Sequence, residues 1–236
     1  MQVVHTIDEV RDIIKKVKKE DKKVGFVPTM GFLHEGHLSL VEISRQHADF
    51  HVMSIFVNKI QFNDISDFDS YPKDLERDIS LAAEAGIDLI FIPDDSEMYK
   101  NNLTTVDVSQ LTDNLCGAHR PGHFQGVFTV VSKLFNIVDP DVAVFGQKDI
   151  QQATSLEKMV IDLNFPVKMI LGPIIREDDG LAMSSRNKHL STEERKNAAR
   201  GPKYIFLCLQ KKKNHKKPHT LRIERENIIQ LAMDND

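Results

Sequence analysis

Two kinds of hydrophobic pattern alternate along the chain: short continuous apolar runs, and longer stretches in which apolar residues recur every three or four positions. The first periodic stretch runs from Ile7 to Val17 behind Thr6, a suitable N-cap residue, and the polar run KKEDKK follows it. This pattern predicts a helix that starts after Thr6. A strand is then expected from Val24 to Val27.

The remaining elements continue this alternation. Apolar runs rich in Val, Ile and Phe and bounded by Pro, Gly or Asp predict further strands at Val52 to Val57, Leu89 to Ile92, Val142 to Phe145 and Val167 to Leu171. Helical spacing predicts helices at Leu38 to His47, Pro72 to Ala85, Gln125 to Ile137 and Ile150 to Leu163. Strands that alternate with helices need crossover connections and form a parallel sheet covered on both faces. The expected fold is therefore α/β, a Rossmann-like doubly wound parallel sheet.

The pattern changes after Asn187. Ser191 and Glu194 have the spacing of a capping box, and Gly201 with Pro202 should stop the helix that follows. The basic run KKKNHKKPH at 211–219 is typical of a solvated linker, although a phosphate-binding patch is the alternative, and 220–236 predicts a short terminal helix. We therefore divide the chain into a domain at 1–174 and a C-terminal segment at 175–236.

Composition narrows the classes of function. The 236 residues are 41% hydrophobic, and a net charge of -4 does not favour nucleic acid as a partner. Cys116 and Cys208 lie far apart without zinc-ribbon spacing, so both are expected to be reduced thiols. The N-terminal MQVVHTIDEVRDIIKK lacks the apolar run of a signal peptide, and no stretch reaches membrane-spanning length. We expect a cytoplasmic protein that does not bind membranes.

The candidate chemistry lies in PTMGFLHEGH, directly after the first predicted strand and before a helix. Ligands of parallel sheets bind beyond the carboxyl ends of the strands. Glycine allows the backbone to turn sharply there, and the N–H groups of the following helix favour an anion. His34 and His37 would add hydrogen-bond donors at the same place.

Two other interpretations of the histidines stay open. Zinc proteases use H-E-x-x-H with the two histidines one helical turn apart, whereas His34 and His37 are three residues apart with Gly36 between them. No third metal ligand accompanies the pair, so no metal site is predicted. A glycine turn with two surface histidines and no ligand is the other alternative.

With these residues in place, the sequence resembles a known family. P-T-M-G-x-L-H-x-G-H is similar to the H-x-G-H signature of the nucleotidyl transferase superfamily, and in this wording it resembles the pantothenate synthetases, which are pantoate–beta-alanine ligases. Four more blocks follow in the family's order: FVNKIQF, RPGHFQGV, FGQKDIQQ and IREDDGLAMSSRN. The resemblance covers about residues 1–194, and five ordered blocks are hard to obtain by chance.

The resemblance implies an ATP-dependent ligase of pantothenate biosynthesis. In the family, the pantoate carboxylate attacks the alpha-phosphorus of ATP, which gives pantoyl adenylate and pyrophosphate. The amine of beta-alanine then displaces AMP. No protein nucleophile is needed, so the protein has to position the reactants and stabilise developing phosphate charge. Magnesium is expected to arrive with ATP, and a homodimer is expected from the family.

The resemblance also assigns residues. His37, His34, Lys148 and Arg186 are the implied catalytic residues, with His37 as proton donor or charge stabiliser. The implied ATP-binding residues are Met30, Gly31, His34, His37, Gly146, Gln147, Lys148, Asp149, Ile175, Met183, Ser184, Ser185 and Arg186. The implied residues for pantoate and beta-alanine are Gln61, Gln152, Asn58 and His123. Taken without the family, Lys148 is typical of a solvated loop, SSRN and RPGHF are typical of turns, and His123 could be purely structural.

Two features depart from the family. Lys59 stands where the family has proline, so the backbone that aims Gln61 should be less rigid. The family also has a small carboxyl-terminal domain, which is expected to be reduced here, and a lid matters because water destroys acyl adenylates. Two alternatives follow: a nucleotide-binding protein of the same fold with impaired ligase activity, and another adenylyl or cytidylyl transferase of the superfamily.

Overall fold

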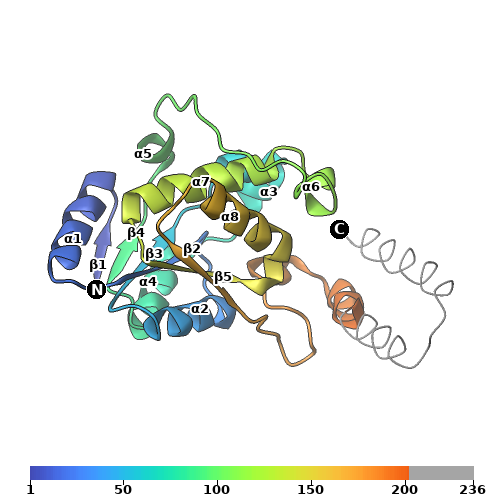
Figure 1. The fold of residues 1–236 in the computed structure, drawn as a ribbon. Coiled ribbons are helices and arrows are strands. Elements are labelled where there is room, and N and C mark those ends of the chain that lie inside the picture. Colours follow the sequence, from blue (N-terminus) through green and yellow to red (C-terminus); the bar gives the residue numbers. More distant parts are fainter. Residues whose placement is uncertain (202–236) are drawn as a thin grey trace, which may run out of the picture. The chain divides into compact units, whose positions relative to one another are not determined.

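The computed structural model describes residues 1–201 of the chain. The chain divides into two compact units, Met1–Ile174 and Ile175–Asp236, and each is described separately. The first unit is built on a six-stranded parallel sheet with the order β1-β4-β3-β2-β5-β6 (Figure 1). Its strands are β1 Gln2–Val4, β2 Val24–Thr29, β3 Phe50–Ile55, β4 Leu89–Phe91, β5 Val142–Gly146 and β6 Lys168–Gly172.

Helices connect these strands. The α-helices are α1 Ile7–Lys19, α2 Glu35–Arg45, α3 Ile65–Ser70, α4 Leu75–Glu84, α5 Asp95–Tyr99, α6 Cys116–His119, α7 His123–Val138 and α8 Ile150–Asp162. Short 3-10 turns are η1 Lys59–Gln61 and η2 Gln147–Asp149 in the first unit, and η3 Ser185–His189 in the second. Within residues 1–201, every helix is too short or too polar to span a lipid bilayer.

All five predicted strands and the doubly wound α/β class are confirmed. The sequence interpretation missed β1, because a three-residue strand leaves too short a pattern to detect. It also placed the start of α2 at Leu38, whereas the helix begins at Glu35 because His34 is its N-cap. The start of α4 was placed at Pro72, but Asp74 is the N-cap and the helix begins after it.

The structure confirms the helix caps that the sequence predicts at Thr6 and Ser191. Thr6 caps α1 in a full capping box, in which its hydroxyl accepts from the Glu9 N–H and the Glu9 carboxylate accepts from the Thr6 N–H. The Ser191–Glu194 capping box is also present, and 192–201 are helical through Gly201. The predicted stop at Pro202, the linker at 211–219 and the terminal helix at 220–236 lie outside the described residues.

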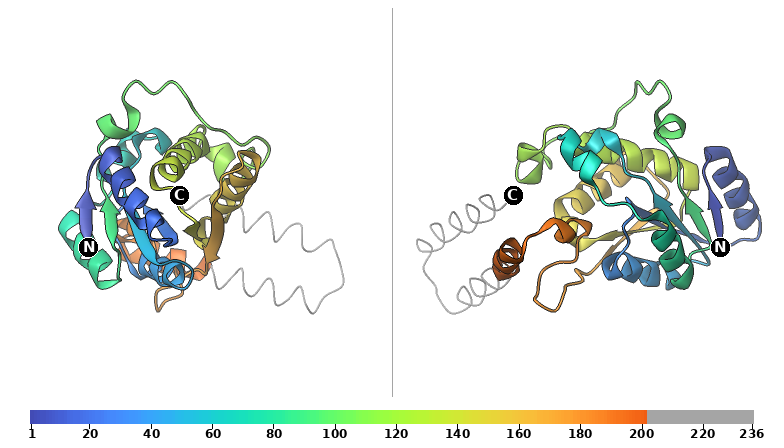
Figure 2. Two further views of the ribbon diagram at one scale, coloured as in Figure 1. Left: turned by 60° about the vertical axis from the view of Figure 1, so that its left-hand side comes forward. Right: turned by 180° about the vertical axis from the view of Figure 1, so that it is seen from behind.

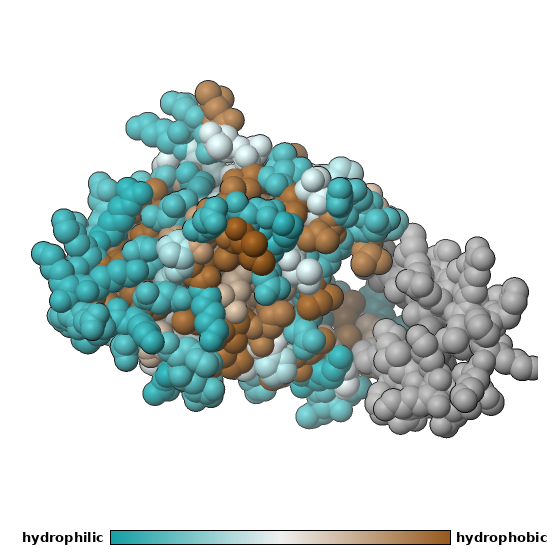
Figure 3. Space-filling model, viewed as in Figure 1, coloured by the Kyte–Doolittle hydropathy of each residue, from teal (hydrophilic) through white to brown (hydrophobic). Residues whose placement is uncertain are grey.

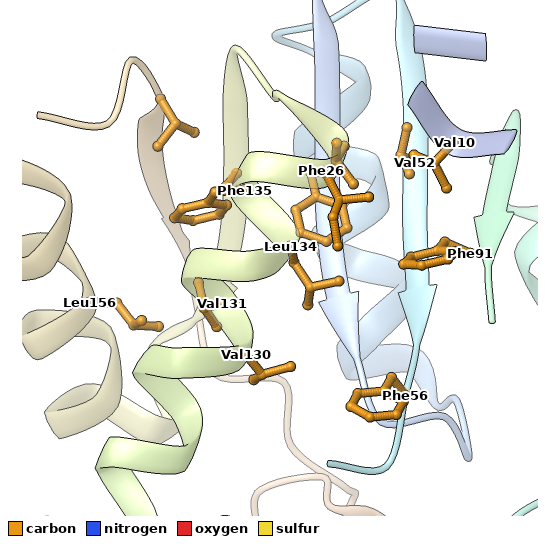
Figure 4. Packing of buried hydrophobic residues seen from close by; sticks show 14 of the residues in the cluster. Val10, Phe26, Val52, Phe56, Phe91, Val130, Val131, Leu134, Phe135 and Leu156 are labelled. Carbon is orange, nitrogen blue, oxygen red and sulfur yellow. The ribbon is translucent and has the colours of Figure 1, made fainter. Parts of the chain in front are cut away.

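Helices cover both faces of the sheet (Figure 2), and two hydrophobic clusters hold them there. On one face, α1, α7 and α8 cover the sheet, and Phe135 of α7 meets Phe26 of β2 edge to face at 6.5 Å between ring centroids. Figure 4 shows this side of the core, with Val130 and Leu134 of α7 lying toward the strands and Val131 on the side of Leu156. On the other face, α2 and α4 pack on the sheet around an all-aliphatic cluster.

The strand order places the switch point of the sheet between β2 and β5. β2 pairs with β3 on one side and with β5 on the other. The chain therefore leaves the carboxyl ends of β2 and β5 at neighbouring positions, which is where ligands bind in open parallel sheets. The segments that follow these strands are Met30–His34 and Gln147–Asp149, and both contain residues of the predicted site.

Candidate active site

The turn after β2 is fixed by a buried carboxylate. Asp78 of α4 is 1% exposed, and its two oxygens accept from the N–H groups of Phe32 and Leu33 at 2.7 Å each. Gly31 has φ +82°, and a Cβ at this position would lie 2.9 Å from the Asp78 carboxylate. Only glycine therefore fits the turn both conformationally and sterically. The carboxylate and the glycine together set the direction in which the chain enters α2.

His34 and His37 form a capping box made of two imidazoles at the start of α2. The Gly36 N–H donates to Nδ1 of His34 at 3.1 Å, and the His34 N–H donates to Nδ1 of His37 at 3.3 Å. The two rings face each other with centroids 4.0 Å apart. Because each Nδ1 accepts a hydrogen bond, each neutral ring carries its hydrogen on Nε2. The helix start therefore presents two ring N–H donors in addition to its own dipole.

The charge state of His37 follows from its surroundings. Burial, the His34 ring and the Lys148 ammonium together lower the pKa of His37 to about 3. The ring is therefore neutral at pH 7 and can donate a hydrogen bond without carrying a charge. Lys148 lies in η2 beyond β5 and forms an ion pair with Asp149 at 3.0 Å, with the lysine side chain 39% exposed. A pair this exposed contributes little to stability, so the ammonium can exchange partners readily.

A second group of predicted residues forms a buried amide cluster. Asn58 is 1% and Gln61 9% exposed. Nδ2 of Asn58 donates to Oε1 of Gln61 at 2.9 Å and to the Gly126 carbonyl at 3.1 Å. Nε2 of Gln61 in turn donates to Sδ of Met30 at 3.1 Å, directly before the glycine turn. The cluster therefore joins the FVNKIQF and PTMGFLHEGH blocks.

His123 holds this cluster from the start of α7. Its Nδ1 lies 2.8 Å from the Gln61 carbonyl and its Nε2 lies 3.2 Å from the Arg120 guanidinium. A carbonyl only accepts and a guanidinium only donates, so the neutral His123 ring carries its hydrogen on Nδ1, the opposite tautomer to His37. These contacts give His123 a structural role, which was one of the two interpretations the sequence left open.

The other predicted residues of the first unit lie near the carboxyl end of β5. Gly146 ends this strand, Gln147 begins η2, and Gln152 lies in the first turn of α8 and is half-buried. In the described residues, no hydrogen bond joins Gln152 to the amide cluster. The structure thus places His34 and Lys148 close enough to His37 to lower its pKa, and it links the amide cluster to Met30 separately.

The second unit contains the remaining predicted residues. Its first part is a tight hairpin in which Arg176 and Ala182 form an antiparallel bridge and the Met183 N–H donates to the Ile175 carbonyl at 3.0 Å. Gly180 takes φ +92° in the turn. Ile175 and Met183 therefore lie at the base of the hairpin, directly before the SSRN segment.

The SSRN segment forms η3, with Ser184 as its N-cap. The Ser184 hydroxyl accepts from the Arg186 N–H at 3.3 Å, and Ser185 is buried. Asn187 closes the segment, because its side-chain amide donates to the Glu177 carboxylate at 2.6 Å. Arg195, in the helix at 192–201, donates a hydrogen bond to the Glu177 carboxylate of the same hairpin. This contact lowers the pKa of Glu177 below its usual value.

Comparison with known proteins decides the family. The model of the pantoate-beta-alanine ligase family matches residues 2–234. A pantothenate synthetase of Thermoanaerobacter sp. is 61% identical over 199 residues, which are 84% of this chain and 70% of that protein. The chain belongs to the pantoate-beta-alanine ligase family.

Solved structures of this family have the same fold. Pantothenate synthetase from Thermus thermophilus superposes with a TM-score of 0.90 at 44% identity, over 98% of this chain and 82% of that one. The pantoate-beta-alanine ligase of Francisella tularensis, solved in complex with beta-gamma ATP and beta-alanine, gives a TM-score of 0.84 at 33% identity, over 97% and 86% of the two chains.

Sequence reasoning missed three residues that support the ligase family's motif blocks in this chain. Asp78 braces the glycine turn, Tyr99 donates to Oδ1 of Asn58 at 2.6 Å, and Glu177 closes the SSRN segment. Asp78 sits within an amphipathic helix and Glu177 in a charged turn, so neither has a local signal. Tyr99 lies 41 residues from its partner Asn58. Only the fold reveals these contacts, because their partners are distant in sequence.

One cavity lies next to the site without containing its histidines. It has a volume of about 250 Å³ and lies beyond the carboxyl ends of β3 and β4. Its lining shares Met30 and Gly31 with the predicted ATP-binding residues, and the rest comes mainly from the ends of the two strands and the start of α4. Asp78, whose carboxylate braces the turn, also lines this cavity.

Proposed function

We propose that this protein condenses pantoate with beta-alanine at the expense of ATP, through a pantoyl-adenylate intermediate, and releases AMP and pyrophosphate. The observation that carries the proposal is the imidazole pair at the start of α2, placed at the switch point of the sheet with both Nε2 atoms as donors. The family match over residues 2–234 supports the same reaction.

In the first step, a carboxylate oxygen of pantoate forms a bond to the alpha-phosphorus of ATP while the bond to the bridging oxygen of pyrophosphate breaks. Negative charge moves onto the leaving pyrophosphate. We assign the Nε2–H groups of His34 and His37 and the ammonium of Lys148 to the phosphate oxygens, where fixed donors stabilise such charge. Because His37 is neutral, it acts as a hydrogen-bond donor rather than as an acid that loses a proton.

We assign the second unit's Ser184, Ser185 and Arg186 to the pyrophosphate. Two hydroxyls and a guanidinium that stays charged are suited to hold phosphate oxygens. Met30, Gly31 and Gly146 would allow the nucleotide to approach the backbone closely, because none of them carries a branched or charged side chain. Gln147, Asp149, Ile175 and Met183 complete the proposed ATP-binding set.

In the second step, the amine nitrogen of beta-alanine attacks the acyl carbon of pantoyl adenylate, AMP leaves, and the amine loses a proton. We assign the pantoate pocket to Gln61 and Asn58, with Gln152 from α8 as a third amide and His123 as a support. Buried neutral amides can bind hydroxyl and carboxylate oxygens without an uncompensated charge. The Francisella relative, complexed with beta-gamma ATP and beta-alanine, supports ATP and the amine as substrates.

We propose that magnesium is bound through ATP rather than held by the protein. No cluster of three or more His, Cys, Asp or Glu side chains in residues 1–201 could hold a metal ion. Mg²⁺ typically keeps several waters and binds through substrate phosphates, so phosphate oxygens would supply its ligands here. The neutral imidazoles and Lys148 would then bind phosphate oxygens directly rather than the metal.

We also propose a cytoplasmic homodimer. The exposed free thiol of Cys116 fits a reducing compartment. Hydrophobic residues gather near the middle of the face in Figure 3, over α8. Ile161 and Leu163 at the end of α8, and Leu171 of the edge strand β6, are all exposed. An apolar edge of this kind is typical of a surface covered by a partner, and sedimentation velocity would test the dimer.

A two-stage assay tests the reaction. Purified protein is incubated with ATP, magnesium and pantoate while pyrophosphate is measured, and beta-alanine is then added while pantothenate and AMP are measured. The proposal requires pyrophosphate in the first stage and both products in the second. Folded protein that releases no pyrophosphate would support a nucleotide-binding protein with impaired ligase activity. Turnover only with CTP, or with another acceptor in place of pantoate, would support a different nucleotidyl transferase.

A further inference from the structure

The hydrogen bonds of the amide cluster have fixed directions, and the Tyr99 hydroxyl is the donor at one end of the cluster. The Gly126 carbonyl can only accept, so the atom of Asn58 that faces it at 3.1 Å is Nδ2. The same Nδ2 donates to Oε1 of Gln61, and Oδ1 of Asn58 therefore points away, toward the Tyr99 hydroxyl at 2.6 Å. Each member of the chain from Tyr99 through Asn58 to Gln61 has one possible orientation.

The orientation of Gln61 decides which ligand atoms it can bind. Its Oε1 is occupied by the Asn58 amide, and one Nε2 hydrogen goes to the Met30 sulfur. The hydrogen of Gln61 that remains for a ligand is therefore the second Nε2–H. This donor suits a carboxylate or hydroxyl oxygen of pantoate.

We propose that Tyr99 is a positioning residue for pantoate, which helps to hold the Gln61 amide in place by donating to Oδ1 of Asn58. This inference rests on the proposed ligase function. Tyr99 ends α5, packs its ring 6.0 Å from that of Phe56 at the end of β3, and lies 5.9 Å below the Lys133 ammonium. These ring contacts hold the hydroxyl in place independently of the ligand.

The hydroxyl keeps its hydrogen under all assay conditions. Burial, helped by the Asp95 carboxylate, raises the pKa of Tyr99 above its usual value. Without this donor, the buried Oδ1 of Asn58 would lack a partner, and the Asn58 amide would be held only by its bonds to Gln61 and to the Gly126 carbonyl. The Gln61 amide, which is bonded to Asn58, would then be positioned less firmly for the pantoate carboxylate.

The test compares Tyr99→Phe, Gln61→Ala and the double variant in the full chain. Tyr99→Phe keeps the ring contacts and removes only the hydroxyl, so it should fold. We expect it to raise the KM and Kd for pantoate about tenfold, the equivalent of one lost buried hydrogen bond, and to leave the KM for ATP unchanged. In the Gln61→Ala background, Tyr99→Phe should have no further effect, because Tyr99 acts through Gln61.

Lys133→Met is the matched control, because it removes the other polar contact of the Tyr99 ring and leaves the hydroxyl bond intact. It should leave the KM for pantoate unchanged. An unchanged KM for pantoate in Tyr99→Phe, an equal rise in the KM for ATP, or full additivity with Gln61→Ala would each overturn the inference while the wild-type protein remains active. If the folded wild-type protein neither forms pantothenate nor binds pantoate by calorimetry, the proposed function fails, and this inference with it.

Discussion

Acid should destabilise this protein through His37, and the size of the effect follows from the burial of the ring. In the folded protein, burial together with His34 and Lys148 lowers the pKa of His37 from 6.5 to about 3. Between these two values the unfolded chain binds a proton that the folded protein does not, so stability falls as the pH falls. The slope is about 1.4 kcal/mol per pH unit, which amounts to about 2 kcal/mol lost between pH 6.5 and pH 5.

His37→Gln isolates this contribution. Glutamine at the third position of a helix can return a hydrogen bond to the N-cap N–H, so the capping box at His34 should survive while the titration disappears. The free energy of unfolding would be measured by urea denaturation at pH 7 and pH 5 in both proteins. We expect the wild-type protein to lose about 2 kcal/mol more than the variant on this change of pH.

Comparing the variant with the wild-type protein cancels the contribution of other histidines, such as His51, whose pKa is also lowered by burial. His47→Gln, at an exposed position beyond the end of α2, controls for the substitution itself and should behave like the wild-type protein. Equal pH dependence in His37→Gln and wild type would refute the reasoning. The ring would then be solvated, and a neutral imidazole donor could not be part of the mechanism.

Three further substitutions follow from the geometry. Gly126→Ala would place a Cβ 2.6 Å from the Ile60 carbonyl oxygen, and we expect thermal denaturation to show a loss of about 1–3 kcal/mol from overpacking, together with a higher KM for pantoate. Lys59→Pro puts proline at the first position of η1, where its fixed φ fits. Urea denaturation should therefore show a free energy of unfolding that is higher by about 0.4–1 kcal/mol. A loss of stability would contradict the helical geometry at this position. Asp78→Ala leaves two backbone N–H groups of the turn at 31–33 unpaired, which should cost about 1–3 kcal/mol of stability for each group and raise the KM for ATP. Asp78→Asn keeps one acceptor, so it should change the stability and the KM for ATP less.

The fold was largely predictable from the sequence because its signals are local. Each predicted strand is a continuous apolar run, and the helix caps at Thr6 and Ser191 depend on residues three positions apart. β1 escaped detection because its three residues are too short for a pattern and its partner β4 lies far along the chain. The start of α2 was misplaced because histidine is not a usual N-cap, and its Nδ1 takes the place of a serine or aspartate oxygen.

The candidate site was predictable only in part, because only some of its signals are local in sequence. The motif blocks contain the residues that we propose to face ligands, and each block is contiguous in sequence. The residues that orient them, such as Asp78 and Tyr99, belong to other elements and have no pattern of their own. The opposite tautomers of His37 and His123 also could not be read from the sequence, since they depend on which partner each ring nitrogen meets.

If the proposed ATP site is correct, the two imidazoles would let it attract a highly charged nucleotide without strong self-repulsion. Cationic side chains at both positions would repel Lys148 and the positive end of α2 before any ligand arrives. Neutral rings avoid this cost and still offer two Nε2–H donors, because the capping bonds occupy both Nδ1 atoms. When phosphate oxygens approach Nε2, their negative charge favours the protonated ring, so the pKa of His37 should rise on nucleotide binding. The added proton goes to Nδ1 and breaks the capping bond from the His34 N–H. Proton uptake with ATP, measured by calorimetry in two buffers, is therefore expected to be larger at pH 5.5 than at pH 7.5, and to be absent in His37→Gln.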